Sequence, residues 1–155
     1  MVEGQHVKPW ASLFEVSTYA LGLWGLLYTM DIVLTCYVGG VGIPTRLFQS
    51  LVAYWLAANW LQGLWCFSFK PEFVQHLYIP TLLLAASSLS FGLAHGEITA
   101  FILEQGGSLS VLARGMLYAF RLPFSMHSVW MAAAALLNFN SWVAVRSCKQ
   151  AGQLN

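Results

Sequence analysis

The sequence predicts an all-α integral membrane protein in which residues 1–155 form a single domain, a bundle of four transmembrane helices with a short interfacial helix before the last one. Hydrophobic residues make up 58% of the chain and charged residues only 8%, whereas an ordinary soluble domain has about 25% charged residues. Several uncharged runs are long enough to cross a hydrocarbon core of about 30 Å. Breaks that contain glycine or proline separate these runs and divide the chain into spans.

The first span is expected at about residues 16–38, after a short polar lead. It carries a single acid, Asp31, and a turn rich in glycine ends it at residues 39–44. An acid inside a span is a candidate functional group, although this one also lies near enough to the end of the span to reach the interface. Four residues follow the helical period and share one face: Trp24, Tyr28, Asp31 and Thr35.

The second span, about residues 47–69, has 23 residues without a charge. Asn59 and Gln62 are its polar groups in mid-membrane. Its three tryptophans step by five residues and therefore spiral round the helix, which directs at least one of them into the bundle. They are Trp55, Trp60 and Trp65.

The third span, about residues 77–95, begins with Pro80, which is tolerated in the first turn of a helix. Gly92 and Gly96 form a GxxxG pair, a spacing that permits close approach of a neighbouring helix. A cluster of serines precedes this pair: Ser87, Ser88 and Ser90.

Residues 97–121 are predicted to be a loop with an amphipathic helix, because Gly106 and Gly107 break the apolar pattern. That helix either lies at the interface or extends the last span at its N-terminus. A continuous helix over residues 109–145 would measure about 55 Å, more than one crossing needs. Pro123 is the expected junction, since proline suits a helix start and disrupts a helix interior.

The last span, about residues 122–145, lies within the 24 uncharged residues between Arg121 and Arg146. Polar groups at membrane depth usually turn toward a helix bundle or a cavity. The polar residues of this span recur on one helical face, so we expect neighbouring helices on that side. The face contains His127, Met131, Ala134, Asn138 and Ser141.

Charge, cysteine content and motifs argue against several classes of protein. Seven Lys/Arg against six Asp/Glu give a net charge of +1, and their scatter offers no basic stripe for nucleic acid. The three cysteines have no CxxC spacing, which argues against a disulfide framework and against a zinc site. The sequence has no phosphate loop, nucleophile elbow or metalloprotease motif, so we expect no enzymatic activity.

Three stretches of the chain carry a resemblance. They are LGLWGLLYTM at residues 21–30, AANWLQGLW at residues 57–65 and LPFSMHSVWMAAAALLNFNSW at residues 122–142. In this order they resemble the second, third and fifth spans of the TspO/MBR family, the tryptophan-rich sensory and translocator proteins. The family's usual first span has no counterpart in the chain. The last helix also lacks the tyrosine of the family's proposed sterol motif, since Asn140 to Trp142 precede Arg146.

The resemblance implies a membrane protein that binds a flat, apolar ligand within its bundle, such as a porphyrin or other tetrapyrrole, a sterol-like molecule or a lipid. A pocket for such a ligand needs aromatic walls and a few fixed polar groups. Each candidate also has a structural alternative, because asparagines bond neighbouring helices and tryptophans pack or lie at the interface. The candidate ligand-binding residues are Trp24, Tyr28, Asn59, Trp60, Trp130 and Asn138.

Two histidines are candidate axial ligands for haem iron or chlorophyll magnesium, His127 and His95. The alternative for a lone intramembrane histidine is a hydrogen bond to a neighbour. Asp31 and Gln62 complete the polar groups expected inside the spans. The sequence does not indicate any cofactor other than these tetrapyrroles, and it predicts no metal site.

A function from a different class stays open. The chain would then be a small structural subunit of a large photosynthetic or respiratory membrane complex, packed against partner helices, pigments and lipids. We expect a homo-oligomer or such a subunit, because a partner can complete the bundle where the first span is missing. An organelle membrane, plastid (thylakoid) or mitochondrial, is the expected location.

Overall fold

The computed structural model describes residues 22–40, 42–68, 70–105 and 107–153. They form α1 (Gly22–Gly40), α2 (Thr45–Ser68), the short 3-10 helix η2 (Pro71–His76), α3 (Tyr78–Gln105) and α4 (Val111–Gln153). No described residue lies in a strand, which confirms the predicted all-α class. The polar lead and residues 16–21 of the predicted first span lie outside the described residues.

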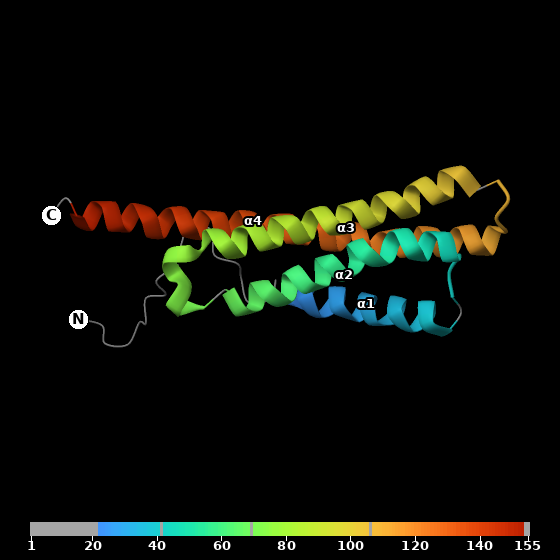
Figure 1. Ribbon diagram of the computed structural model, residues 1–155, viewed down its shortest axis with the longest axis horizontal. Helices are drawn as coiled ribbons and strands as arrows, with labels where there is room; N and C mark the ends of the chain where they lie inside the picture. Colours follow the sequence, from blue (N-terminus) through green and yellow to red (C-terminus); the bar gives the residue numbers. More distant parts are fainter. Residues whose placement is uncertain (1–21, 41, 69, 106, 154–155) are drawn as a thin grey trace.

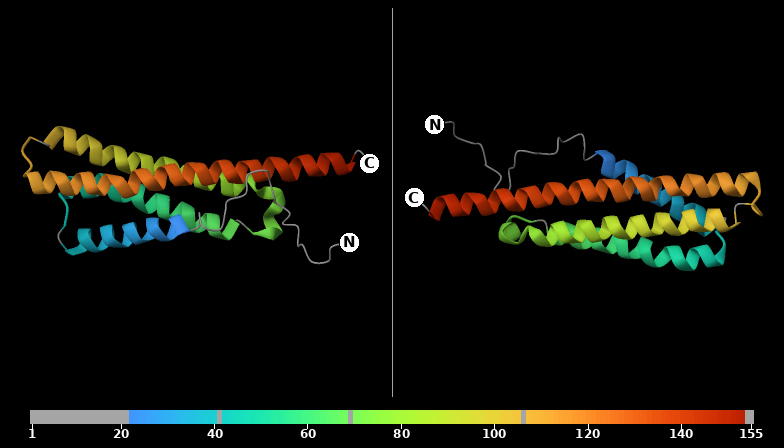
Figure 2. Two further views of the ribbon diagram at one scale, coloured as in Figure 1. Left: turned by 180° about the vertical axis from the view of Figure 1, so that it is seen from behind. Right: turned by 90° about the horizontal axis from the view of Figure 1, so that it is seen from above.

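The four long helices form an elongated bundle (Figure 1). Consecutive helices run antiparallel, so α1 and α3 point one way while α2 and α4 point the other way. α3 packs along both α2 and α4, whereas α1 packs chiefly against α4 (Figure 2). α1 is therefore the helix with the least support from the rest of the bundle.

Three of the described helices are long and apolar enough to cross a membrane: α1, α3 and α4 as far as Ser147. α2 has 24 residues, enough length for a crossing. Its tyrosine, tryptophans and amides keep its hydropathy below that of the other three. The helical membrane bundle is thus supported, and the fourth crossing stays a prediction.

Charged residues gather at one end of the bundle, where α2 begins and α3 ends. Arg46 of α2 pairs with Glu104 of α3, with 3.3 Å between Nη1 and Oε2. Arg121 of α4 donates a hydrogen bond from Nε to His95 Nε2 of α3 over 3.3 Å. These groups mark one limit of the apolar part of the bundle.

The opposite limit follows from helix direction. Lys70 follows α2 and Arg146 lies near the end of α4. Because α2 and α4 run the same way, these two cations lie at the same end, opposite to Arg121. Asp31 is the only Asp, Glu, Lys or Arg between the two limits in the described helices.

The core is built along α3 and its two neighbours. The hydroxyl of Ser87 in α3 donates to the Ala58 carbonyl of α2 over 3.0 Å. Ser88 of α3 and Ser128 of α4 bond reciprocally, each hydroxyl donating to the other residue's carbonyl over 2.7 and 2.9 Å. Small and polar side chains thus bring the backbones together, as is usual where lipid provides no hydrophobic driving force.

The predicted close approach of a neighbouring helix at the GxxxG pair is found at Gly92 and not at Gly96. A Cβ added to Gly92 would lie 3.4 Å from the Ser128 hydroxyl, so this glycine lies where α3 and α4 approach closely. A Cβ at Gly96 would meet no atom of the described residues within 4 Å. Only the first glycine of the pair therefore serves helix packing.

The prediction for residues 97–121 was wrong in its main feature. α3 continues to Gln105, and α4 begins at Val111 and runs through Pro123 without a break. The N-terminal extension of the last span is thus the arrangement found. Proline removes one helical hydrogen bond, but Leu117 and Phe124 on either side of it are buried in the core. Packing along the long α3 helix keeps the first turns of α4 helical.

Candidate functional site

The predicted inward face of the last helix is the buried face of α4. His127 and Met131 are fully buried, and Ala134 and Asn138 nearly so. The Asn138 side chain donates to the Ala134 carbonyl of its own helix over 2.8 Å. Among the described residues, the bond that this asparagine makes is thus within α4 and not to a neighbouring helix.

The buried face of α1 is rotated from the one expected. Its buried residues are Leu27, Asp31 and Leu34, whereas the prediction centred the face on Trp24, Tyr28, Asp31 and Thr35. Trp24 is half-buried at the edge, and Tyr28 and Thr35 are exposed. Helical period defines which residues share a face, but contact with α4 decides which face turns inward.

An aromatic cluster joins α1, α2 and α4. The Trp24 ring stacks on Trp65 of α2, with centroids 5.3 Å apart and planes 3° apart. It also meets Trp130 of α4 edge-on at 6.2 Å and 81°, and Tyr28 at 6.0 Å. Trp65 was not among the candidate site residues; the five-residue tryptophan spacing was the only signal that pointed to it.

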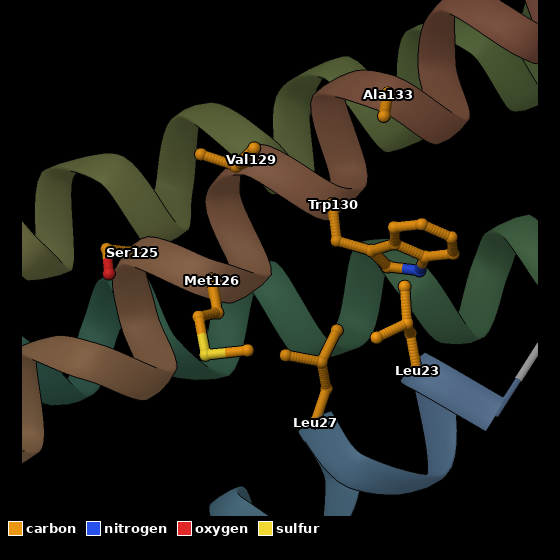
Figure 3. A pocket seen from close by; sticks show the side chains of 7 residues that line it. All are labelled: Leu23, Leu27, Ser125, Met126, Val129, Trp130 and Ala133. Carbon is orange, nitrogen blue, oxygen red and sulfur yellow. The ribbon is translucent and has the colours of Figure 1, made fainter. Parts of the chain in front are cut away.

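A groove lies between α1 and α4 beside this cluster (Figure 3). Its volume is about 350 Å³, and we call it the Trp130 groove. Figure 3 shows Leu23 and Leu27 of α1 facing Met126 and Trp130 of α4 across it. The residues that line it are Leu23, Leu27, Ser125, Met126, Val129, Trp130 and Ala133.

A second groove of about 330 Å³ follows the same two helices toward the Arg121 end. Its walls include Met30 and Tyr37 of α1, and Met116, Phe120 and Pro123 of α4. Tyr37 and Phe120 meet edge-on at 5.0 Å across the helices. The contact between α1 and α4 is therefore flanked by apolar grooves along much of its length.

Two candidate residues on α2 lie apart from these grooves. The Asn59 amide donates to the Trp55 carbonyl of its own helix over 2.9 Å. Trp60 is 72% exposed and lines neither groove. Of the six candidate ligand-binding residues, the structure brings together Trp24, Tyr28 and Trp130.

The two candidate axial histidines do not face a common centre. His95 lies at the level of Arg121 and accepts its hydrogen bond. His127 follows Arg121 by six residues on α4, about 9 Å along the helix axis. The described residues contain no group of three or more His, Cys, Asp and Glu that could hold a metal ion.

A polar site lies next to the aromatic cluster, with Tyr28 common to both. The Tyr28 hydroxyl donates to Gln62 Oε1 of α2 over 2.9 Å. His127 Nδ1 lies 3.6 Å from Asp31 Oδ1. The polar residues expected inside the spans, Asp31 and Gln62, thus lie in the buried interior rather than at the interface.

Residues 3–153 match the sequence model of a family described as "TSPO-like protein". The chain belongs to the TSPO-like protein family. This confirms the resemblance read from the three tryptophan-rich stretches. No curated protein and no solved structure matches the chain. In this TSPO-like protein, Trp24 and Trp130 from the first and last stretches are in contact, and Trp130 lines the Trp130 groove.

Proposed function

We propose that this TSPO-like membrane protein binds a flat, apolar ligand of the porphyrin or tetrapyrrole class in the Trp130 groove. The observation that supports this most is that the Trp130 ring lines the groove and is held by its edge-on contact with Trp24. Aromatic side chains favour stacked and edge-on contacts with planar rings. The groove therefore offers both apolar walls and an aromatic surface to a planar ligand.

The size of the groove suits part of such a ligand. Its volume of about 350 Å³ falls at the lower end of small-molecule sites, which range from about 300 to 1,000 Å³. The second groove continues along the same two helices, so a larger ring or its substituents can extend along the contact. A lipid chain is the competing occupant.

Titration of protoporphyrin IX into the purified full chain in detergent micelles tests this function. We expect the porphyrin absorption band to shift and saturate at one ligand per chain, with quenching of tryptophan fluorescence. Non-saturating quenching, equal to that of empty micelles with added tryptophan, would contradict the proposal. Displacement of the porphyrin by added phospholipid would identify lipid as the natural competitor.

Filling the groove should weaken binding. Ala133 lines the groove, and Ala133→Trp places an indole in the ligand's volume. We expect at least about a tenfold rise in Kd, equivalent to about 1.4 kcal/mol. Porphyrin absorption is the readout, because the added indole changes protein fluorescence. Leu136→Trp adds the same ring on the exposed face of α4, and its Kd should match that of the wild type.

A substitution at Trp60 distinguishes the ligand site expected from the sequence, which includes Trp60, from the Trp130 groove, which does not. The sequence grouped it with the ligand-binding residues, whereas its side chain is exposed away from both grooves. Trp60→Leu should therefore leave the porphyrin Kd unchanged within about twofold, a difference of about 0.4 kcal/mol. A tenfold loss in this variant would favour a site on α2 over the Trp130 groove.

The weak support of α1 favours the second candidate function, a subunit of a larger complex. Of its 19 residues, only three are buried, so a partner helix has a broad apolar face to cover. Gentle extraction of plastid or mitochondrial membranes, followed by native gel separation, tests this role. Migration with a large coloured complex would support it, and migration as a small particle would contradict it.

A further inference from the structure

Asp31 and His127 form an isolated pair inside the apolar part of the bundle. Asp31 Oδ1 of α1 lies 3.6 Å from His127 Nδ1 of α4. The His127 side chain is fully buried, and that of Asp31 is 11% exposed. Hydrocarbon offers no polar partners, so such groups depend on other protein groups for compensation.

Neither member of the pair has another polar partner among the described residues. Both carboxylate oxygens of Asp31 and both ring nitrogens of His127 are buried without a hydrogen bond. The imidazole is held instead by rings: Phe91 of α3 stacks on it at 4.4 Å and 6°, and Tyr28 meets it edge-on at 6.1 Å. Among the described residues, each member of the pair is therefore the other's nearest ionisable partner for a proton.

We propose that Asp31 and His127 together bind one proton inside the membrane and that this proton keeps α1 against α4. With one proton the pair is neutral overall, as a carboxylate beside an imidazolium or as a carboxylic acid beside a neutral imidazole. Loss of the proton leaves a lone buried carboxylate. A second proton leaves a lone buried imidazolium. Either lone charge is costly at this depth.

The groups described around the pair do not supply a charge that would compensate a lone carboxylate or a lone imidazolium. On α1 the Tyr28 hydroxyl donates to the neutral Gln62 of α2, and both the Cys66 thiol of α2 and the Asp31 carboxyl lie near this phenol. Because the phenol is uncharged near neutral pH, it supplies no charge to balance the pair. α3 presents the Phe91 ring. His95 of α3 is hydrogen-bonded to Arg121 of α4 at the limit of the apolar part of the bundle.

The position of the pair explains why its charge would decide how firmly α1 packs against α4. Asp31 is the middle one of three buried residues on α1, between Leu27 and Leu34. Few other contacts hold this helix, so a lone charge at Asp31 or His127 acts directly on its contact with α4. Docking of α1 should be firmest when one proton is bound and weaker on both the acidic and the alkaline side. This inference does not depend on ligand binding by the Trp130 groove.

Nuclear magnetic resonance of the unmodified full chain in micelles counts the protons. Asp31 is the only aspartate in the sequence, so ¹³C-aspartate reports its carboxyl group alone. ¹⁵N-histidine reports the imidazoles, and His127→Gln assigns the His127 signal. Near neutral pH we expect one of two states: a carboxylic acid at Asp31 or an imidazolium at His127. A carboxylate with a neutral imidazole, or both groups protonated, would overturn the proposal.

Tryptophan fluorescence then follows the docking of α1, because Trp24 stacks on Trp65 and meets Trp130. We expect the wild-type spectrum to change on both sides of the range from about pH 5 to pH 8, where histidine normally titrates. Asp31→Asn should abolish the alkaline change, and His127→Gln should abolish the acidic one. His95→Gln, which alters the histidine bonded to Arg121 at the limit of the apolar part, should keep both changes.

Two results would overturn the link between the proton and α1. One is a wild-type fluorescence spectrum that does not change over the range in which the resonance signals titrate. The other is that Asp31→Asn and His127→Gln both retain both changes. Where a variant fails to fold, the labelled wild-type chain still decides the proton count and the fluorescence still decides the docking.

Discussion

Phe91→Ala is expected to lower the free energy of unfolding by about 3 kcal/mol, the largest effect of any substitution considered for this protein. Phe91 is fully buried, stacks on His127 at 4.4 Å and packs against Phe124 at 6.2 Å. Its loss leaves a cavity where α3 meets α4 and removes the ring that holds the imidazole. In a bilayer the cost comes from lost packing rather than from water exposure. Unfolding in mixed micelles of increasing denaturing detergent measures it.

Leu89→Ala on the same helix is the control. Leu89 is 65% exposed and faces the surroundings of the bundle, where lipid replaces the lost methyl groups. Its free energy of unfolding should therefore change by no more than about 0.5 kcal/mol. Equal losses in the two variants would show that burial within the bundle does not decide stability here.

Gly92→Leu is expected to cost about 2 kcal/mol through overpacking. A Cβ at this position already lies 3.4 Å from the Ser128 hydroxyl, so a leucine must displace Ser128 or push α3 away from α4. Either movement strains the reciprocal hydrogen bonds of Ser88 and Ser128. The same unfolding titration in mixed micelles measures the loss.

Gly96→Leu provides the matched comparison, one turn further along α3. No atom of the described residues lies within 4 Å of a Cβ at Gly96, so its leucine points into open space and removes a flexible glycine from a helix. We expect unchanged or slightly higher stability, by up to about 1 kcal/mol. A loss at Gly96 as large as that at Gly92 would contradict the close approach assigned to Gly92.

Composition and periodicity were enough to predict the class of the protein and the buried face of its last helix. The 24-residue uncharged run between Arg121 and Arg146 predicted a membrane helix. The period of His127, Met131, Ala134 and Asn138 predicted the face that α4 buries. These features follow from local rules, since helix geometry and the cost of polar groups in lipid depend on the sequence alone.

Helix ends and helix orientation needed the tertiary structure. Local rules placed a helix start at Pro123, but packing against α3 carries α4 through this residue from Val111. The same rules grouped the residues of one α1 face without showing how far this helix is rotated. Trp60 was grouped with Trp24 because of the family resemblance, which does not show that its side chain is exposed.

The sequence by itself determined that the chain is a helical membrane protein with tryptophan-rich stretches typical of the TSPO-like family. It also showed one acid and two histidines in apolar surroundings, because charge and hydropathy are visible residue by residue. Only the tertiary structure decided which of these groups meet. Asp31 and His127 are separated by 96 positions in the chain, and no local pattern relates them. They face each other because α1 and α4 run antiparallel in contact, which is a property of the packed bundle.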